Sequence, residues 1–328
     1  MGDLNIMTNF QVYRKVLSFS FLMFLVDLFG LILLGGSATA GYFIANQSTD
    51  MALIGLTVGF VIGIILAVLV NIFIASRIKA AQIAMMVKGV TEGYLPDNTF
   101  SAGFAEIKGR FGSIIAFYLV THAIKAIFNQ ISRGINQLGT ALGGQTGNAI
   151  TSTIDSAIQT LLSYLCDCCL GWVLYRKDVS TAKAGCEGAV IFFKHGKTLI
   201  RNIGRIFGMG FLSLILIGGA FFGITYLIFI QFPTMFDSLI AEIMEAAARN
   251  GGEVSEILQN PAMFMIIAAA FVGIALWAIL HSVLIRPFIL TGVMRNYMAS
   301  GIADIPTEKD FAELDSKSPR FAKLHRNI

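Results

Sequence analysis

Two apolar segments of the chain carry polar side chains at a regular spacing, and these side chains are the first candidates for chemistry. Within and just after the segment 113–139, ionisable and amide residues recur at steps of three or four: His122, Lys125, Asn129, Arg133, Asn136 and Thr140. At 100° per residue these positions fall on one face of a helix. Charged residues in an apolar helix indicate contact with protein or water rather than with lipid.

The next apolar segment, 148–175, has a similar face, formed by Asn148, Ser152, Asp155, Gln159, Ser163 and Cys166. A lone charge at the membrane centre costs about 2.5–3.5 kcal/mol on insertion scales, so we expect Lys125 and Asp155 to pair in the outer leaflet. Asp27, Asn71 and His281 would join from the inner half. The sequence therefore predicts a transport pathway lined by His122, Lys125, Asn129, Asp155, Gln159 and Asp27.

The same two polar faces also have a structural interpretation. Polar side chains hold membrane helices to one another or to a partner subunit. Helices that lie flat in the membrane interface carry polar faces as well. A solute pathway, a helix contact and an interfacial position are therefore all compatible with the two faces.

A cysteine cluster, "YLCDCCLGW" at 164–172, follows the second polar face. A tetrahedral zinc site needs about four convergent ligands, and the other cysteine and the scattered histidines show no metal-ligand spacing. Inert packing is therefore the favoured role, with S-palmitoylation of Cys168 or Cys169 as an alternative. Asp167, next to a basic loop, is expected to pair with a lysine or arginine. We expect no metal and no cofactor.

The overall composition indicates that these residues belong to a membrane protein. The chain has 328 residues, of which 55% are hydrophobic and 13% charged, and its mean hydropathy is +0.73. Soluble domains carry about a quarter charged residues, so this chain is an integral membrane protein. Its apolar runs are long and unbroken, as in "LIGLTVGFVIGIILAVLV". Such runs indicate transmembrane helices rather than barrel strands.

Six apolar runs predict an all-α polytopic fold, with six transmembrane helices in three hairpins forming one membrane domain over residues 1–328. The predicted spans are 17–44, 51–76, 113–139, 148–175, 206–231 and 262–285. Lys and Arg concentrate before the first span and after the second, fourth and sixth. By the positive-inside rule this pattern places both termini, including a tail at 301–328, in the cytoplasm.

Two of the basic flanks resemble each other. "RIKAAQIAMMVKGVTEGYLP" after the second span and "RPFILTGVMRNYMASGIADIP" after the sixth both begin at Arg, pass through Met-rich helical sequence and end at Pro. We interpret them as cytoplasmic amphipathic helices. Their likeness has two explanations: an internal repeat, or the general similarity of cytoplasmic flanks. A third flank, "KHGKTLIRNIGR", is basic enough to bind anionic lipid headgroups, but its charge is also that of a flank that only sets the topology.

The stretch "CDCCLGWVLYRKDVSTAKAGCEGAVIFFKHGKTLIRNIGRI" resembles part of the C-terminal half of the choline transporter-like family. There a cysteine cluster with a tryptophan precedes a cytoplasmic segment and an Asn-containing basic stretch. The matching positions are Cys166, Cys168, Cys169, Trp172, Ala184, Gly188, Phe192, Asn202 and Arg205. The family is longer, with more spans and a large extracellular loop that this chain lacks. The resemblance implies transport of choline-like quaternary amines, which favour aromatic faces.

Two functions are compatible with the sequence. The first is a permease or channel-like carrier for a small polar or cationic solute. The second is a non-catalytic integral membrane scaffold or anchor subunit of a larger membrane complex. For the protein in general, the expected partners are the lipid bilayer and either copies of the chain or other membrane subunits. The chain contains no Gly-rich phosphate loop, H-E-x-x-H or G-x-S-x-G motif, so we expect no enzymatic activity. It also lacks the concentrated basic surface of a nucleic-acid binder.

Overall fold

The computed structural model describes residues 9–45, 49–110, 148–200, 203–232 and 260–326, together with scattered positions between 234 and 245. Every regular element in these ranges is a helix. Four of the helical stretches are long and apolar enough to cross a membrane: Asn9–Ile44, Ile54–Thr91, Phe207–Gln231 and Pro261–Ala303. The expectation of an all-α membrane protein is confirmed.

The prediction of six spans is not supported by the described residues. The third predicted span, 113–139, lies outside them. The fourth corresponds to α6 (Asn148–Tyr175), which is not among the four membrane-length candidates. From Tyr164 to Leu174, α6 is buried by other helices of the same chain. This part of the apolar run therefore packs against protein, whereas the prediction placed it in lipid.

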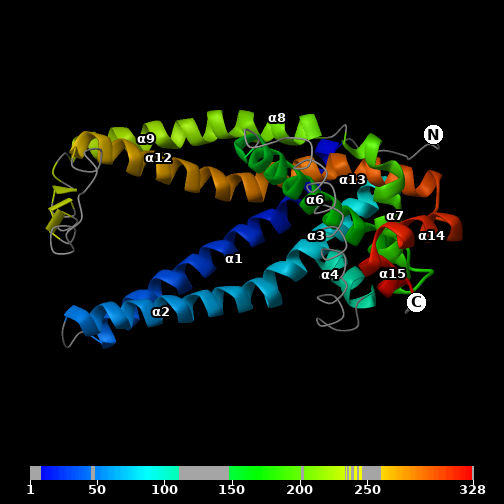
Figure 1. Cartoon of the computed structure of the whole chain (residues 1–328), viewed down its shortest axis with the longest axis horizontal. Helices are drawn as coiled ribbons and strands as arrows, with labels where there is room; N and C mark the ends of the chain where they lie inside the picture. The colour runs from blue at the N-terminus through cyan, green and yellow to red at the C-terminus, as the bar shows by residue number, and fades with distance from the viewer. Residues whose placement is uncertain are drawn as a thin grey trace. The chain divides into compact units, whose positions relative to one another are not determined.

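The chain divides into two compact units (Figure 1). Unit 1 comprises Met1–Arg205 and Pro287–Ile328, and unit 2 comprises Ile206–Arg286. Each unit contains one pair of membrane-length helices. Unit 1 also contains the shorter helices, which form a buried core.

The hairpin of unit 1 consists of α1 (Asn9–Ile44) and α2 (Thr49–Val70), which run side by side along their length (Figure 1). Their backbones touch at glycines: a Cβ added at Gly41, Gly55 or Gly59 would overlap main-chain atoms of the facing helix. Gly55 and Gly59 have the four-residue spacing of small residues at which membrane helices approach closely. The sequence "GLTVG" thus places α2 directly on α1.

The same two helices continue into the core. The buried residues of α1 all lie in its first third: Val12, Val16, Phe19 and Ser20. Beyond them, large apolar side chains such as Phe29 and Ile32 are exposed on the protein surface, as expected for residues that face lipid. The second helix of the hairpin, α2, passes through a π-helical turn (Asn71–Ala75) into α3 (Ser76–Thr91), which is largely buried.

The core of unit 1 brings together α3, α4 (Thr99–Arg110), the second half of α6, α7 (Thr181–Ile200) and α13 (Arg286–Ala303). Its largest fully enclosed side chains include Trp172 and Tyr297. The buried amide of Gln82 in α3 donates a 2.7 Å hydrogen bond to the hydroxyl of Ser20 in α1. This bond fixes the first third of α1 against α3.

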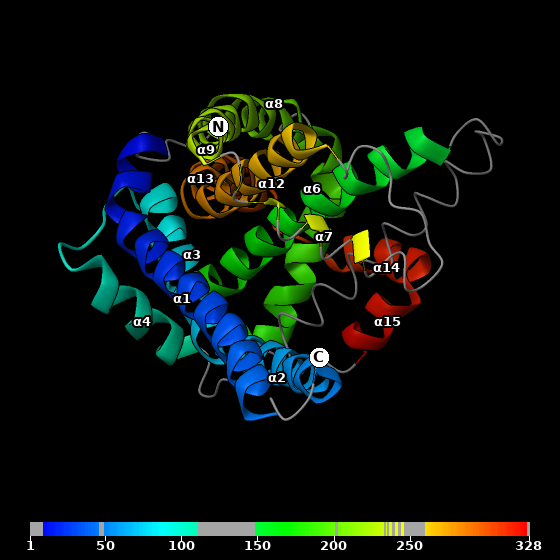
Figure 2. The same cartoon turned by 90° about the vertical axis from the view of Figure 1, so that its left-hand side faces the viewer.

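The predicted tail is folded onto the core. Helices α14 (Glu308–Lys317) and α15 (Pro319–His325) lie beside α7 (Figure 2). Their buried Phe311, Leu314 and Phe321 form one cluster with Cys186, Ala189 and Val190 of α7. The side chain of Ser318 caps α15 by accepting a hydrogen bond from the backbone N–H of Phe321.

The hairpin of unit 2 pairs α8 (Ile203–Ser213), a π-helical turn (Leu214–Gly218) and α9 (Gly219–Gln231) with α12 (Pro261–Leu280). Trp277 of α12 donates a 3.0 Å hydrogen bond from Nε1 to the hydroxyl of Ser213. At Gly273 the helices are close, since an added Cβ would lie 2.9 Å from the carbonyl oxygen of Gly218.

The two flanks that resemble each other in sequence also share a local structure. In each case a membrane-length helix passes through a π-helical turn, Asn71–Ala75 or His281–Ile285, into a largely buried helix, α3 or α13. A short proline-containing connection and a further helix, α4 or α14, follow. The two flanks therefore share an order of elements, and the internal repeat stays a prediction.

Candidate functional site

The best-defined polar arrangement lies in the core of unit 1, where α6 meets α7. Trp172 donates a 3.0 Å hydrogen bond from Nε1 to Oε2 of Glu187. Nη1 of Arg176 lies 3.0 Å from the same carboxylate oxygen, and its guanidinium lies 5.9 Å from the centroid of the Trp172 ring. The Glu187 side chain is only 3% exposed. Its charge is therefore stabilised by one cation and one indole rather than by water.

Arg110, the last residue of α4, fixes the end of α6. Its Nε donates to the carbonyl of Val173 at 2.9 Å, and its Nη2 donates to the carbonyls of Arg176 and Val179 at 2.8 Å each. The last carbonyls of a helix lack partners within the helix and carry the negative end of its dipole. Arg110 therefore caps α6 and holds α4 against it.

A second arginine contact orders the loop that follows α6. Nε and Nη2 of Arg176 each donate a 2.8 Å hydrogen bond to the carboxylate of Asp178. These bonds hold the pKa of Asp178 below its ordinary value and raise the pKa of Arg176. The guanidinium thus connects the exposed Asp178 with the buried Glu187.

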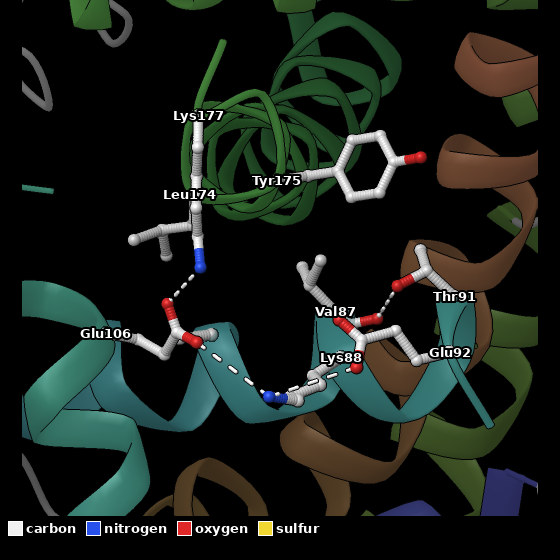
Figure 3. A pocket seen from close by; sticks show the side chains of 9 residues that line it. Val87, Lys88, Thr91, Glu92, Glu106, Leu174, Tyr175 and Lys177 are labelled. Carbon is white, nitrogen blue, oxygen red and sulfur yellow. Dashed lines mark hydrogen bonds and ion pairs between the residues drawn. The ribbon is translucent and has the colours of Figure 1, made fainter. Parts of the chain in front are cut away.

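A pocket of about 160 Å³ opens where α3, α4 and the end of α6 meet (Figure 3). Nζ of Lys88 lies 3.8 Å from Oε2 of Glu92 and 3.9 Å from Oε1 of Glu106. Glu106 also forms an ion pair with Lys177. The pocket therefore contains two cations and two anions. Its lining consists of Ala84, Val87, Lys88, Thr91, Glu92, Glu106, Leu174, Tyr175 and Lys177.

The cysteine cluster lies inside the core. All four cysteines are buried and free of disulfides. Cys169 donates a 3.4 Å hydrogen bond to the carbonyl of Gly185, and the hydroxyl of Tyr297 donates a 2.5 Å bond to the carbonyl of Gly188. Cys168 and Cys169 are fully buried. S-palmitoylation of either sulfur would therefore require the core to open.

Two further groups in the core are explained by their surroundings. Nζ of Lys79 lies 2.6 Å from Oδ1 of Asp167, which confirms the prediction that Asp167 pairs with a basic residue. Burial, together with the nearby charges of Asp315 and Glu187, raises the pKa of Cys186 to about 12. Its thiol is therefore protonated at neutral pH.

Most of the predicted pathway falls where the structure is not described. His122, Lys125 and Asn129 lie outside the described residues. Asp155 belongs to α6, but only its backbone is described. Gln159 is described as an exposed residue of the same helix. The polar seam between the two segments stays a prediction.

Asp27 is the one predicted pathway residue whose side chain lies in a described membrane-length helix. It is half-buried in α1, seven residues beyond Ser20, the last buried residue of that helix. Within the described ranges, its carboxylate has no hydrogen-bond or ion-pair partner. An acidic side chain at this depth in a membrane is energetically costly and typically functional.

Sequence reasoning missed the residues around the pocket and the buried network. Glu187 had a usable signal, because it is the single charge within the apolar run "AGCEGAVIFF", and a charge in such a run needs a buried partner. No sequence signal marked the other three residues. Arg110 and Lys88 look like ordinary topology-setting charges, and Glu106 looks like an ordinary surface carboxylate. Only the packing of α3, α4 and α6 brings them together.

No family model, curated protein or solved structure matches this chain. The resemblance to the choline transporter-like family accordingly stays a prediction. The roles suggested for the pocket and the buried network are based on their geometry alone.

Proposed function

We propose that this protein is an integral membrane scaffold, a non-catalytic subunit that holds a rigid helical platform against one face of the membrane. The supporting observation is the continuity of α1 and of α2 with α3. These helices run from apolar, lipid-exposed segments directly into the buried core. A platform joined to its anchor by unbroken helices is suited to position a partner relative to the membrane.

The proposed topology has four spans, with the core and both termini in the cytoplasm. The core contains basic residues that follow the first hairpin, such as Arg77, Lys79 and Lys88, and those that follow α6, such as Arg176 and Lys177. By the positive-inside rule, such residues stay on the cytoplasmic side.

Native purification tests the scaffold. The full chain is extracted from its own membrane with a mild detergent, and the mass and subunit composition of the complex are measured. We expect stoichiometric co-purification of other membrane subunits. Phe321→Asp, which introduces a charge into the buried contact between α15 and α7, should reduce co-purification while the chain remains in the membrane. A preparation that contains only monomers or small homo-oligomers would reject the scaffold.

A carrier for a small polar or cationic solute is the second candidate. It is favoured by Asp27, whose carboxylate has no partner among the residues that the structure describes. Its test is choline uptake by proteoliposomes containing the wild type, Asp27→Asn or Asp155→Asn. For a carrier, both substitutions should lower uptake while leaving assembly unchanged. If Asp155→Asn instead abolishes expression, a structural contact between helices explains the polar face better.

A further inference from the structure

In the pocket between α3, α4 and α6, one lysine ammonium lies between two carboxylates without forming a hydrogen bond to either. Lys88 is 28% exposed at its side chain, and its ammonium lies between two carboxylates at 3.8 and 3.9 Å. Both distances exceed the range of a hydrogen bond. A partly buried ammonium that attracts two anions but bonds to neither can still donate to an incoming acceptor.

The pocket also provides the complementary groups. Glu92 has Lys88 as its ion-pair partner within the described residues, and only at 3.8 Å, so its carboxylate can accept a hydrogen bond from a ligand. Tyr175 also borders the pocket, but its hydroxyl points away from the Lys88 ammonium (Figure 3). The apolar side chains of Val87 and Leu174 line the rest of the space.

Charge and size limit the class of ligand. Glu92 and Glu106 repel a phosphate or another polyanion, whereas Lys88 and Lys177 repel a purely cationic amine. The volume of about 160 Å³ corresponds to roughly five water molecules. It is well below the several hundred Å³ of sites for larger organic ligands. A molecule with few atoms and both charges fits these limits best.

We propose that this pocket binds a small zwitterion of the aliphatic α-amino acid class. The ligand carboxylate accepts a hydrogen bond from Lys88. Its ammonium donates to Glu92, and its aliphatic part packs on Val87 and Leu174. The 3.8 Å separation of Lys88 and Glu92 matches a ligand whose two charges lie on adjacent carbon atoms. Because the site depends on neither transport nor partner binding, it can be tested independently of the proposed scaffold.

Calorimetric titration of the full chain in detergent with three matched probes tests the proposal. L-valine carries both charges, isovalerate lacks the ammonium, and isobutylamine lacks the carboxylate. We expect saturable binding of L-valine and at least about tenfold weaker binding of each single-charge probe, since each loses one ionic contact. Absence of L-valine binding, or equal binding of the three probes, would overturn the proposal.

Substitutions of pocket residues then test whether L-valine binds in this pocket. Lys88→Gln and Glu92→Gln should each weaken L-valine binding about tenfold or more. The control, Lys309→Gln, removes one exposed lysine of α14 far along the chain and should leave the affinity unchanged. Unfolding curves of each variant show whether the fold is intact. If a folded Lys88→Gln variant binds L-valine as the wild type does, the ligand site is elsewhere.

Discussion

The two units hold their membrane helices together by different means. In unit 1, α1 and α2 are in backbone contact at Gly41, Gly55 and Gly59, and both run into a core with buried ion pairs. In unit 2, α12 contacts α8 through a Trp277–Ser213 hydrogen bond and comes close to the π-helical turn and α9 at Gly273. Lipid gives little hydrophobic drive for helix association, so each unit relies on close packing or on polar bonds.

This difference indicates where each unit is sensitive to substitution. Backbone contact has no room for a side chain, and a buried ion pair does not tolerate loss of one partner. A single side-chain hydrogen bond between membrane helices contributes much less to stability. Substitutions at the backbone contacts and the buried ion pair of unit 1 should therefore have large effects, and loss of the Trp277–Ser213 bond in unit 2 a small one. The four predictions that follow test this contrast, from the largest expected effect to the smallest.

Glu187→Ala should have the largest effect, because it removes the buried acceptor of Trp172 and the buried one of the two carboxylates that Arg176 contacts. Breaking a buried ion pair costs about 3–5 kcal/mol. Unfolding in detergent, followed by circular dichroism, measures the change. Glu313→Ala, which removes an exposed i,i+4 pair with Lys317, is the control and should cost about 0.5 kcal/mol or less. Equal losses for both variants would contradict the buried network.

Gly59→Ala should separate the first hairpin, because the new Cβ would overlap the carbonyl oxygen of Ser37. Overpacking of this kind costs about 1–3 kcal/mol. Gly35→Ala lies in the same hairpin, and no atom lies within 4 Å of its added Cβ. This control should be neutral or slightly stabilising. Unfolding midpoints of the two variants measure the difference, and similar values would exclude backbone contact between α1 and α2.

Alkaline pH should destabilise unit 1 through Cys186. Its pKa is raised to about 12 in the folded protein by burial, so above pH 9 the unfolded chain releases a proton that the folded chain retains. Stability therefore falls as pH rises from about 9 toward 12, by about 1.4 kcal/mol per pH unit for this one thiol. Cys186→Ala should reduce that slope in pH-dependent unfolding. An unchanged slope would show that other groups cause the alkaline sensitivity.

Trp277→Phe in unit 2 should have the smallest effect. It removes the bond to Ser213 but keeps an aromatic ring in place. Hydrogen bonds between membrane helices contribute about 0.6 kcal/mol on average. Ser213→Ala removes the same bond from the other side and should give a similar loss. A much larger loss for Trp277→Phe alone would indicate that the ring, rather than its N–H, holds the hairpin.

Sequence reasoning located the membrane helices better than it located the site. Long apolar runs are local features, so the four described membrane helices could be recognised without a fold. The same criterion misassigned α6, because a helix buried in protein is as apolar as a helix in lipid. The stretch from Tyr164 to Leu174 shows this: its cysteines and Trp172 face other helices. A long apolar run shows that a helix is buried, but it does not show whether protein or lipid surrounds the helix.

The sequence by itself determined that this is an all-α membrane protein, that its charges gather around the membrane helices, and that Asp167 needs a basic partner. These features depend on composition and local spacing. Tertiary structure alone decided that Arg110 caps α6, that Glu187 bonds to Trp172, and that Lys88 meets Glu106 in a pocket. Those contacts join different helices, and their geometry is set by packing that no local pattern encodes.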